Sequence, residues 1–303
     1  MTPPRVVLHP RHPRGVEDSL ASLDIDLVVP DADRIPELLQ DSGILVTYVW
    51  DDAYLPGLRW VQSISAGLDQ FPLDQFERAG VVLTSASGVH APQMAEHAFA
   101  LLLGLTRGVG VASRNATTRT WKPMMLTEIS GLTMGVLGLG AIGEEIARRA
   151  KAWGMRVIGT KHHPDGYTGE AEEVFGPDGT AEVFRRADVV VSVLPGGEET
   201  DGIVTREMLD LLHGWFINLG RGNIVDEADI VAAIEHGGLQ GAGLDVFDTE
   251  PLPAESPLWS HPRIIVTPHV GGFSPSYGDR LSAILEHNLD AFAGRADWRN
   301  RIV

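Results

Sequence analysis

The sequence contains no cysteine, so disulfide bonds, thiolate nucleophiles and cysteine-ligated zinc are excluded. It also has no long hydrophobic run. The longest apolar stretch, residues 98–105, is far shorter than the roughly 20 residues of a transmembrane helix. The N-terminal residues lack the apolar core and small-residue cleavage site of a secretory signal. We therefore expect a cytoplasmic protein that does not associate with a membrane.

Basic residues are scarce relative to acidic ones. The chain has 24 Lys and Arg against 41 Asp and Glu, which gives a net charge of −17. This balance disfavours binding to nucleic acid, and we expect no nucleic-acid partner. The 44% of hydrophobic residues is ordinary for a globular protein. A length of 303 residues is enough for two domains, at about 100–200 residues each.

The first third of the chain alternates short apolar runs with amphipathic stretches. The runs are RVVLH, LDIDLVVP, GILVTYVW, RWVQSIS and GVVLTSA, and helix candidates lie at 34–40 and 73–79. Apolar runs of this length, bounded by Gly, Pro and Asp, are typical of buried parallel strands. The pattern predicts a small α/β domain.

A second α/β region begins near residue 91. The segment APQMAEHAFALLLGLTRGVGVASRNA predicts one long helix, with Pro92 in its first turn. Strand candidates then follow in TMGVLG, MRVIGT, ADVVVSVLP, WFINLG, GAGLDVF and RIIVTPH, with helix candidates such as REMLDLL and EADIVAAIEH between them. This alternation predicts a doubly wound parallel sheet. A last amphipathic helix, SYGDRLSAILEHNLDAFAG, is expected to return to the first domain.

A glycine-rich turn connects the first strand and helix of this second region. Its sequence, GLGAIG, is a G-x-G-x-x-G that starts at Gly138 and ends at Gly143. In such a turn the glycines allow a tight bend, a close approach to a pyrophosphate and close helix–strand packing. A generic βαβ glycine turn is the alternative interpretation. The strand–turn–helix–strand context favours a dinucleotide site.

Three polar residues follow later strand candidates, where open parallel sheets bind ligands. They are Arg221 in INLGRG, Glu250 in LDVFDTEPL and His269 in TPHVGG. A guanidinium can hold a carboxylate with two parallel hydrogen bonds, and a histidine can exchange a proton near neutral pH. A glutamate bonded to that histidine would fix its tautomer. Each residue alone has a structural explanation, but their order after a dinucleotide turn favours a catalytic set.

The ordered set GLGAIG, LPGGEET, INLGRG, LDVFDTEPL and TPHVGG resembles the D-isomer-specific 2-hydroxyacid dehydrogenases over nearly the whole chain. The resemblance implies that Arg221, Glu250 and His269 are catalytic, and that the enzyme interconverts a 2-keto acid and a D-2-hydroxy acid. Glu250 argues against the formate dehydrogenases, which pair the histidine with a glutamine. The segments GVHAPQMAEHAFALLL and PHVGGFSPSY are most similar to the glyoxylate/hydroxypyruvate reductase type.

The resemblance also implies a fold and a set of binding residues. We expect two Rossmann-like α/β domains with doubly wound parallel sheets and a cleft between them. The substrate-binding domain is discontinuous, 1–91 plus 273–303, and the dinucleotide-binding domain is 92–272. Ser65, Ala66 and Gly67 are expected to hold the substrate carboxylate through their backbone amides. Trp50 lines the pocket in one interpretation and is plain core or dimer surface in the other.

The expected cofactor contacts lie along the ends of the second-domain strands, and Asp245 among them matches the residue that binds the nicotinamide carboxamide. The whole set is Gly138, Leu139, Gly140, Ala141, Ile142, Gly143, Thr160, Lys161, His162, Leu194, Pro195, Thr200, Leu219, Gly220, Arg221, Asp245, His269 and Gly271. No metal is expected. His9 and His12 in HPRHP are interpreted as loop residues rather than metal ligands, because no carboxylate partner is placed with them. His90 and His97 are interpreted as packed or solvated side chains of the long helix, with His90 facing the cleft as the alternative.

The choice of cofactor depends on Lys161. NAD-specific sites carry an acidic residue about 20 residues beyond the glycine turn, where it binds the adenosine ribose hydroxyls. Here that place holds Thr160, Lys161 and His162, all of which can donate hydrogen bonds to a 2′-phosphate. We therefore predict that NADP(H) is preferred and NAD(H) possible. In the alternative interpretation Lys161 is a solvated charge and NAD binds through its pyrophosphate.

Other functions stay open at this stage. The pocket volume cannot be read from the sequence, so a reductase of bulkier 2-keto acids, of the D-lactate type, is one alternative. A non-catalytic dinucleotide-sensing protein, similar to the transcriptional corepressors that resemble this family, is another. We also expect a homodimer built on the helix from Pro92 to about Ser113, because that helix has more apolar residues than a one-sided surface helix needs.

Overall fold

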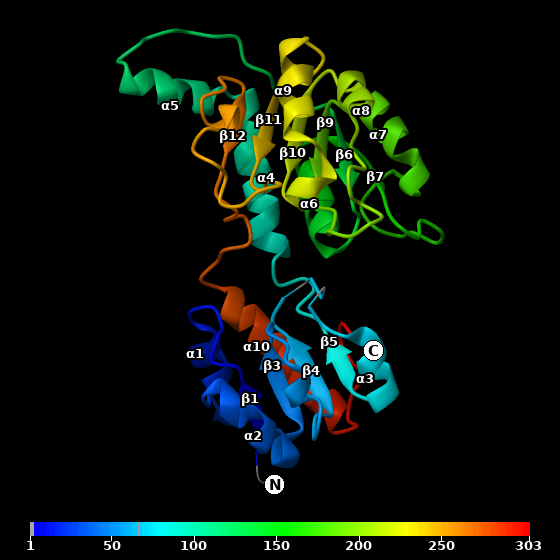
Figure 1. Cartoon of the computed structure of the whole chain (residues 1–303). Coiled ribbons are helices and arrows are strands. Elements are labelled where there is room, and N and C mark those ends of the chain that lie inside the picture. Colours follow the sequence, from blue (N-terminus) through cyan, green and yellow to red (C-terminus); the bar gives the residue numbers. More distant parts are fainter. Residues whose placement is uncertain (1–2, 66, 69) are drawn as a thin grey trace. The chain divides into compact units, whose positions relative to one another are not determined.

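The computed structural model describes residues 3–65, 67–68 and 70–303. They form two compact units (Figure 1). The first joins the residues up to His90 with Phe273–Val303, and the second is Ala91–Gly272. In the described part of the chain, no helix is long and apolar enough to cross a membrane.

The first unit is a parallel five-stranded sheet in the order β2-β1-β3-β4-β5, with helices on both faces. Its strands are β1 (Arg5–Leu8), β2 (Asp26–Val28), β3 (Ile44–Thr47), β4 (Trp60–Ser63) and β5 (Val82–Thr84). Its helices are α1 (Val16–Ala21), α2 (Ile35–Ser42), α3 (Leu73–Ala79) and α10 (Tyr277–Phe292), with 3-10 turns η1 (Ala32–Arg34) and η2 (Asp52–Tyr54).

Alternation along the strands of this unit builds two apolar layers. Val6 and Leu8 of β1 face α1 and α10, whereas Val7 faces α2 and α3. All three side chains are fully buried, as expected for a parallel sheet covered on both faces. The helix α10 therefore completes the first unit, although 182 residues of the second unit separate it in sequence from β5 and its neighbours.

The second unit contains a seven-stranded parallel sheet in the order β12-β11-β10-β9-β6-β7-β8. Its strands are β6 (Thr133–Leu137), β7 (Arg156–Thr160), β8 (Glu173–Phe175), β9 (Val189–Ser192), β10 (Trp215–Asn218), β11 (Gly241–Leu244) and β12 (Ile264–Val266). Its helices are α4 (Ala91–Thr106), α5 (Val109–Thr117), α6 (Ala141–Ala152), α7 (Thr180–Arg186), α8 (Arg206–Leu211) and α9 (Glu227–Glu235), with 3-10 turns η3 (Pro177–Gly179), η4 (Gly222–Ile224) and η5 (Pro257–Trp259).

Helices cover both faces of this sheet. One face packs on α4 and α6, and the other on α7, α8 and α9. From β6 the strand order runs toward one edge of the sheet through β7 and β8. The later strands, β9 through β12, lie on the opposite side of β6. The point where the strand order reverses therefore lies between β6 and β9. In open α/β sheets, ligands bind at the carboxyl ends of the strands beside such a point.

The single helix predicted from residue 91 is wrong in one respect, because the structure contains two helices there. The first, α4, ends at Thr106 and α5 begins at Val109. Gly108 adopts the left-handed conformation, with φ of +66°, which glycine reaches without strain and which ends a helix. A Cβ on Gly108 would also lie 2.8 Å from Met124 Sδ. The packing of Met124 at the break between the two helices therefore favours glycine at this position.

Candidate active site

The parallel strands of the second unit bring most of the predicted site residues to one edge of the sheet. Gly138 follows β6, Lys161 follows β7, Arg221 lies three residues after β10, and Asp245 follows β11. His269 comes three residues after β12. Because all seven strands run parallel, these residues share the carboxyl edge, beside the point where the strand order reverses.

The glycine turn fits the pyrophosphate of a dinucleotide. Gly138 has a φ of +95°, and a Cβ on Gly143 would lie 2.2 Å from the Gly138 carbonyl oxygen, so the turn closes only with glycine at both positions. Around Gly140, by contrast, no heavy atom lies within 4 Å of an added Cβ. That open space adjoins the N-terminus of α6, whose amide groups favour an anion.

His269 and Glu250 form a hydrogen-bonded pair. The distance from His269 Nδ1 to Glu250 Oε2 is 2.7 Å, and 52% of the His269 side chain remains exposed. The second oxygen of Glu250 accepts a hydrogen bond of 3.0 Å from the Phe247 amide, which fixes the carboxylate. A carboxylate at Nδ1 leaves Nε2 as the nitrogen available to a ligand. This is the arrangement of an oriented acid–base histidine.

Arg221 presents its guanidinium without a carboxylate partner among the described residues. Its Nη1 donates to the Gly220 carbonyl at 2.9 Å, and its side-chain stem lies against Gly196, where an added Cβ would be 3.3 Å from Arg221 Cγ. The Asn218 side chain holds the backbone of residues 220–221 in place, because it donates to the Arg221 carbonyl and accepts from the Gly220 amide. The remaining guanidinium donors can therefore bind an anionic ligand.

Lys161 lies against the glycine turn. Its Nζ donates to the Leu139 carbonyl at 2.5 Å, and its backbone amide pairs with Phe175 of β8. Within the described residues no carboxylate forms an ion pair with it. His162 is exposed, with Nδ1 3.7 Å from Glu199 Oε2. Thr160 is only 5% exposed, and its hydroxyl faces the Gly138 amide, so its side chain points away from the surface that Lys161 and His162 share.

The other expected cofactor residues of this unit lie in the loops that follow β9 and β10. Thr200 donates to the Pro195 carbonyl at 2.7 Å, which closes the loop after β9 on itself. Gly220 packs against the Leu194 carbonyl, where a Cβ would come within 2.4 Å. Leu219 is buried in the core between the sheet and α4. The side chain of Leu219 therefore serves packing, and only its backbone faces the edge.

The residues expected to hold the substrate carboxylate belong to the first unit. Ser65 follows β4, and its hydroxyl donates to the Gly67 carbonyl at 2.6 Å, which closes the loop. Ala66 lies outside the described residues. Trp50 is half-buried, and its ring meets the Phe76 ring edge-on at 4.7 Å. Its Nε1 donates to Asp52 Oδ1 at 2.9 Å, so the indole is held on two sides.

Sequence reasoning missed His97, which was interpreted as a packed or solvated side chain. The structure places it on α4 with Nε2 2.9 Å from Thr267 Oγ1 and 3.2 Å from Asp245 Oδ1. It thus belongs to the polar network under the turn that carries His269. No sequence signal could have found it, because 148 residues separate His97 from Asp245 and 170 from Thr267.

The chain is similar to a known protein family and to several of its members. Residues 99–271 match the family described as D-isomer specific 2-hydroxyacid dehydrogenase, NAD binding domain. The chain is 34% identical over 292 residues to D-3-phosphoglycerate dehydrogenase of Bacillus subtilis, covering 92% of this chain but 55% of that protein. It is 30% identical over 310 residues to glyoxylate reductase of Korarchaeum cryptofilum, covering 95% of this chain and 92% of that protein.

Solved structures with the same fold include a D-isomer specific 2-hydroxyacid dehydrogenase family protein from Aeromonas salmonicida. It is 30% identical with a TM-score of 0.80, and the match covers 100% of this chain and 99% of that one. A probable 2-hydroxyacid dehydrogenase from Rhizobium etli, solved with NADP, HEPES and L(+)-tartaric acid, is 26% identical with a TM-score of 0.83. That match covers 100% of this chain and 98% of the other.

The chain belongs to the D-isomer specific 2-hydroxyacid dehydrogenase family. Its enzyme class is that of the NAD(P)-dependent oxidoreductases. The predicted family, the α/β fold class and the enzyme class are thereby confirmed.

Proposed function

We propose that this enzyme reduces a small 2-keto acid, of the glyoxylate or hydroxypyruvate kind, to the D-2-hydroxy acid with NADPH. The observation that carries the proposal is the His269–Glu250 pair, with 2.7 Å between Nδ1 and Oε2, at the sheet edge that also bears the glycine turn and Arg221. A proton donor, a cation for a carboxylate and a dinucleotide turn are the parts that such a reduction needs.

Each of these residues has one chemical task in the proposal. Arg221 binds the substrate carboxylate and polarises the keto oxygen. The cofactor, when bound, supplies the hydride that reduces the keto carbon. His269 gives the proton on Nε2 to the keto oxygen, while Glu250 holds the ring in place through Nδ1.

A small substrate is favoured over a bulky one by the names of the glyoxylate reductase relatives. Trp50 keeps both of its interpretations, as pocket residue and as core: within the first unit its indole is held edge-on by Phe76 at 4.7 Å and by Tyr54 at 6.0 Å.

A keto-acid panel tests this proposal. The purified enzyme is assayed with glyoxylate, hydroxypyruvate, 3-phosphohydroxypyruvate and a branched six-carbon 2-keto acid, each with NADPH and with NADH. We expect the highest kcat/KM for glyoxylate or hydroxypyruvate. A higher value for the branched acid would replace the small-substrate proposal with the bulky one. Tight NADPH binding without turnover of any keto acid would favour a dinucleotide-sensing protein.

The preference for NADPH rests on Lys161 in the proposal. Its ammonium lies at the glycine turn, 2.5 Å from the Leu139 carbonyl oxygen, and no described carboxylate pairs with it. The strand end therefore offers a cation to a 2′-phosphate, where an aspartate would repel it. His162 assists, although it also lies near Glu199. Thr160, expected at first to assist, is left out of the proposed phosphate contacts, since its buried hydroxyl faces the Gly138 amide and its carbonyl accepts from the Gly138 and Leu139 amides. NAD(H) remains usable through the pyrophosphate contacts.

Lys161→Asp is expected to lower kcat/KM for NADPH by about tenfold or more, since a hydrogen bond to a charged group contributes ~1.5–3 kcal/mol. The value for NADH should stay within about twofold of wild type, because NADH has no 2′-phosphate. Steady-state kinetics with both cofactors measure this. Lys151→Ala, which removes an exposed lysine at the other end of α6, is the control. Equal kcat/KM for NADH and NADPH in the wild-type enzyme would contradict the proposed 2′-phosphate site at Lys161.

We also propose a homodimer, but with a contact surface different from the one expected at first. The apolar residues of α4 that prompted that expectation, such as Phe99 and Leu102, pack inside the second unit against α6 and the sheet. Exposed apolar side chains gather instead on the 109–126 segment. This segment comprises α5 and the chain after it (Figure 1). Trp121 is 95% exposed and Met125 97% exposed.

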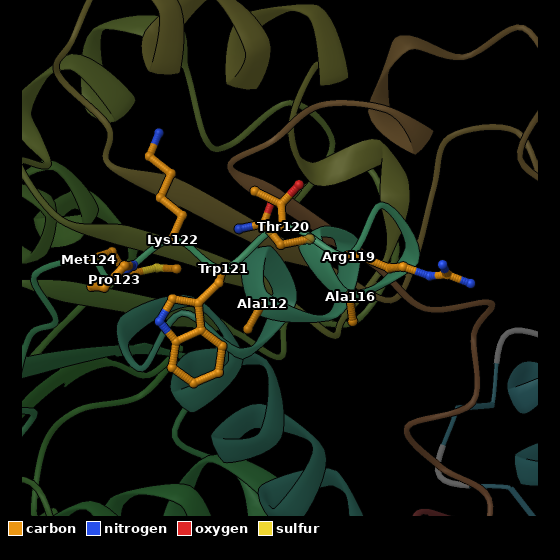
Figure 2. A pocket seen from close by; sticks show the side chains of 9 residues that line it. Ala112, Ala116, Arg119, Thr120, Trp121, Lys122, Pro123 and Met124 are labelled. Carbon is orange, nitrogen blue, oxygen red and sulfur yellow. The ribbon is translucent and has the colours of Figure 1, made fainter.

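The 109–126 segment has the form of a self-complementary surface. The segment also holds a cavity of about 540 Å³, whose lining includes Ala112, Ala116, Thr120, Met124 and Trp121 itself (Figure 2). A two-fold dimer brings the same patch of both protomers together, so a patch with both a projection and a hollow can fill itself. Met125 does not line the cavity of its own chain, and it can occupy the one on a second copy.

The double variant Trp121→Ser, Met125→Ser is expected to be monomeric where the wild type is a dimer. We expect the dimer to weaken by at least about 10⁴-fold, because burying each of the two side chains contributes ~1.5–3 kcal/mol and symmetry counts each change twice. Sedimentation velocity at micromolar concentration is the measurement. Trp259→Ser, which changes a half-exposed tryptophan outside the segment, is the control. A monomeric wild type would refute the dimer.

A further inference from the structure

The turn that carries His269 is built on Asp245. The Asp245 carbonyl accepts from the His269 amide at 2.9 Å, and its carboxylate accepts from the Val270 amide at 3.0 Å and the Gly271 amide at 2.8 Å. His269 itself has a φ of +51°, a left-handed conformation that costs a non-glycine residue about 1–2 kcal/mol. The bonds to Asp245 hold it there.

His97 holds the same carboxylate from the other side. The Thr267 hydroxyl has one proton and donates it to Asp245 Oδ1 at 2.6 Å, so the Thr267 oxygen acts as an acceptor toward His97 Nε2 at 2.9 Å. Asp245 Oδ1 is a second acceptor, 3.2 Å from the same nitrogen. Because Nε2 faces two acceptors, the geometry requires the His97 tautomer with its proton on Nε2.

The carboxylate is charged in this setting. Burial alone would raise the pKa of Asp245, but hydrogen bonds from His97, Thr267 and the amides of Gly271 and Val270 outweigh it and lower that pKa below its usual range. A buried aspartate that keeps its charge depends on every one of these donors. Loss of the His97 donor would leave the negative charge less compensated and free to shift.

The turn has no spare room to absorb such a shift. A Cβ on Gly271 would lie 2.9 Å from Asp245 Oδ2, 3.2 Å from His97 Cδ2 and 3.2 Å from Met94 Sδ. The backbone of the turn is thus packed directly on α4 and on the carboxylate. A movement of the His97 ring or of Asp245 therefore reaches the backbone two residues after His269.

We propose that His97 is a positioning residue for His269, acting through Asp245 and the 267–271 turn. The proposal rests on the proposed function, in which His269 gives the proton. A residue with this role affects the rate of the chemical step more than substrate binding, because a small displacement of a proton donor costs rate while Arg221 still holds the carboxylate.

The test compares His97→Leu with His97→Gln, since the Gln amide nitrogen can reach the place of Nε2 and restore the donor. For His97→Leu we expect kcat to fall about tenfold, the scale of one lost hydrogen bond to a charged group, with KM for the keto acid within about twofold. We also expect the Val270 and Gly271 amides to exchange hydrogen about tenfold faster. His97→Gln should recover most of both losses. His236→Leu, which changes the exposed histidine directly after α9, is the control.

Amide exchange separates this inference from the proposed function. If no keto acid is turned over, the proposed function fails, while faster exchange in His97→Leu still supports the link from His97 to the turn. Exchange and kcat both unchanged in His97→Leu would overturn the inference. A second measurement uses the wild-type protein and so does not depend on a variant folding. In 15N NMR of labelled histidine we expect the His97 proton on Nε2. A proton on Nδ1 alone would overturn the inference.

Discussion

His269→Ala is expected to lower kcat for keto-acid reduction by about 10²–10⁴-fold, the usual contribution of general acid catalysis. The structure gives the reason: Glu250 holds His269 Nδ1 at 2.7 Å, and half of the ring remains exposed to meet a ligand. Without the imidazole, water must supply the proton from an unheld position. The Kd for NADPH should stay within about twofold, because the glycine turn and Lys161 are unchanged. Single-turnover kinetics and a fluorescence titration measure the two quantities.

The control for this variant is His213→Ala, an exposed histidine before β10. It should leave kcat unchanged and so exclude a general effect of removing a histidine from this unit. If His269→Ala retains a rate within a few-fold of wild type, His269 is not the proton donor. The inference about His97 would then lose its catalytic consequence but not its structural basis.

Arg221→Lys is expected to lower kcat/KM for the keto acid by roughly 100-fold, about what the loss of one to two charge-assisted hydrogen bonds at ~1.5–3 kcal/mol each produces. An ammonium keeps the charge but cannot form the two parallel bonds of a guanidinium. The aliphatic part of the Arg221 side chain also packs against Gly196, and the hydrogen bond from Arg221 Nη1 to the Gly220 carbonyl orients the guanidinium. Steady-state kinetics across keto-acid concentrations provide the measurement.

Arg206→Lys is the matched control, because Arg206 is a surface arginine paired with Asp210 on α8. It should leave kcat/KM within about twofold of wild type, since exposed ion pairs contribute little. Unchanged efficiency of Arg221→Lys with small keto acids would place the substrate carboxylate elsewhere.

The fold could be predicted where the hydrophobic pattern is unambiguous. Runs such as TMGVL and WFIN are entirely buried in the structure as β6 and β10, because a parallel strand covered on both faces has no polar side. The glycine turn was predictable for a similar reason. Its three glycines each have a geometric task, and the strand before it and the helix after it are strongly patterned.

Other elements could not be predicted because their residues carry mixed signals. The strand β8 has an exposed Glu173 and two half-buried residues, so it shows no apolar run. The break between α4 and α5 depends on Gly108 turning left-handed beside Met124, a contact that no local pattern reveals. Glycine is tolerated inside some helices and ends others. The sequence alone could therefore not show that the helix breaks at Gly108.

The main residues of the candidate site could be predicted from the sequence, but the contacts that support them could not. Parallel strands bring their carboxyl ends together, so the sequence predicts Arg221 and His269 at one edge of the sheet. The period of two along β7 predicts that the side chains of Thr160 and of the next residue, Lys161, lie on opposite faces of the sheet. The link from His97 to Asp245 spans distant parts of the chain, and only the packing of α4 on the sheet brings them together.

The most direct test of the proposed reaction is the stereochemistry of its product. Wild-type enzyme is incubated with hydroxypyruvate and NADPH, and the glycerate formed is separated by chiral chromatography while cofactor oxidation is followed. We predict D-glycerate, formed one for one with the NADPH consumed. L-Glycerate, or no glycerate while the cofactor binds tightly, would contradict the assignment of this chain as a D-2-hydroxyacid dehydrogenase that reduces small keto acids.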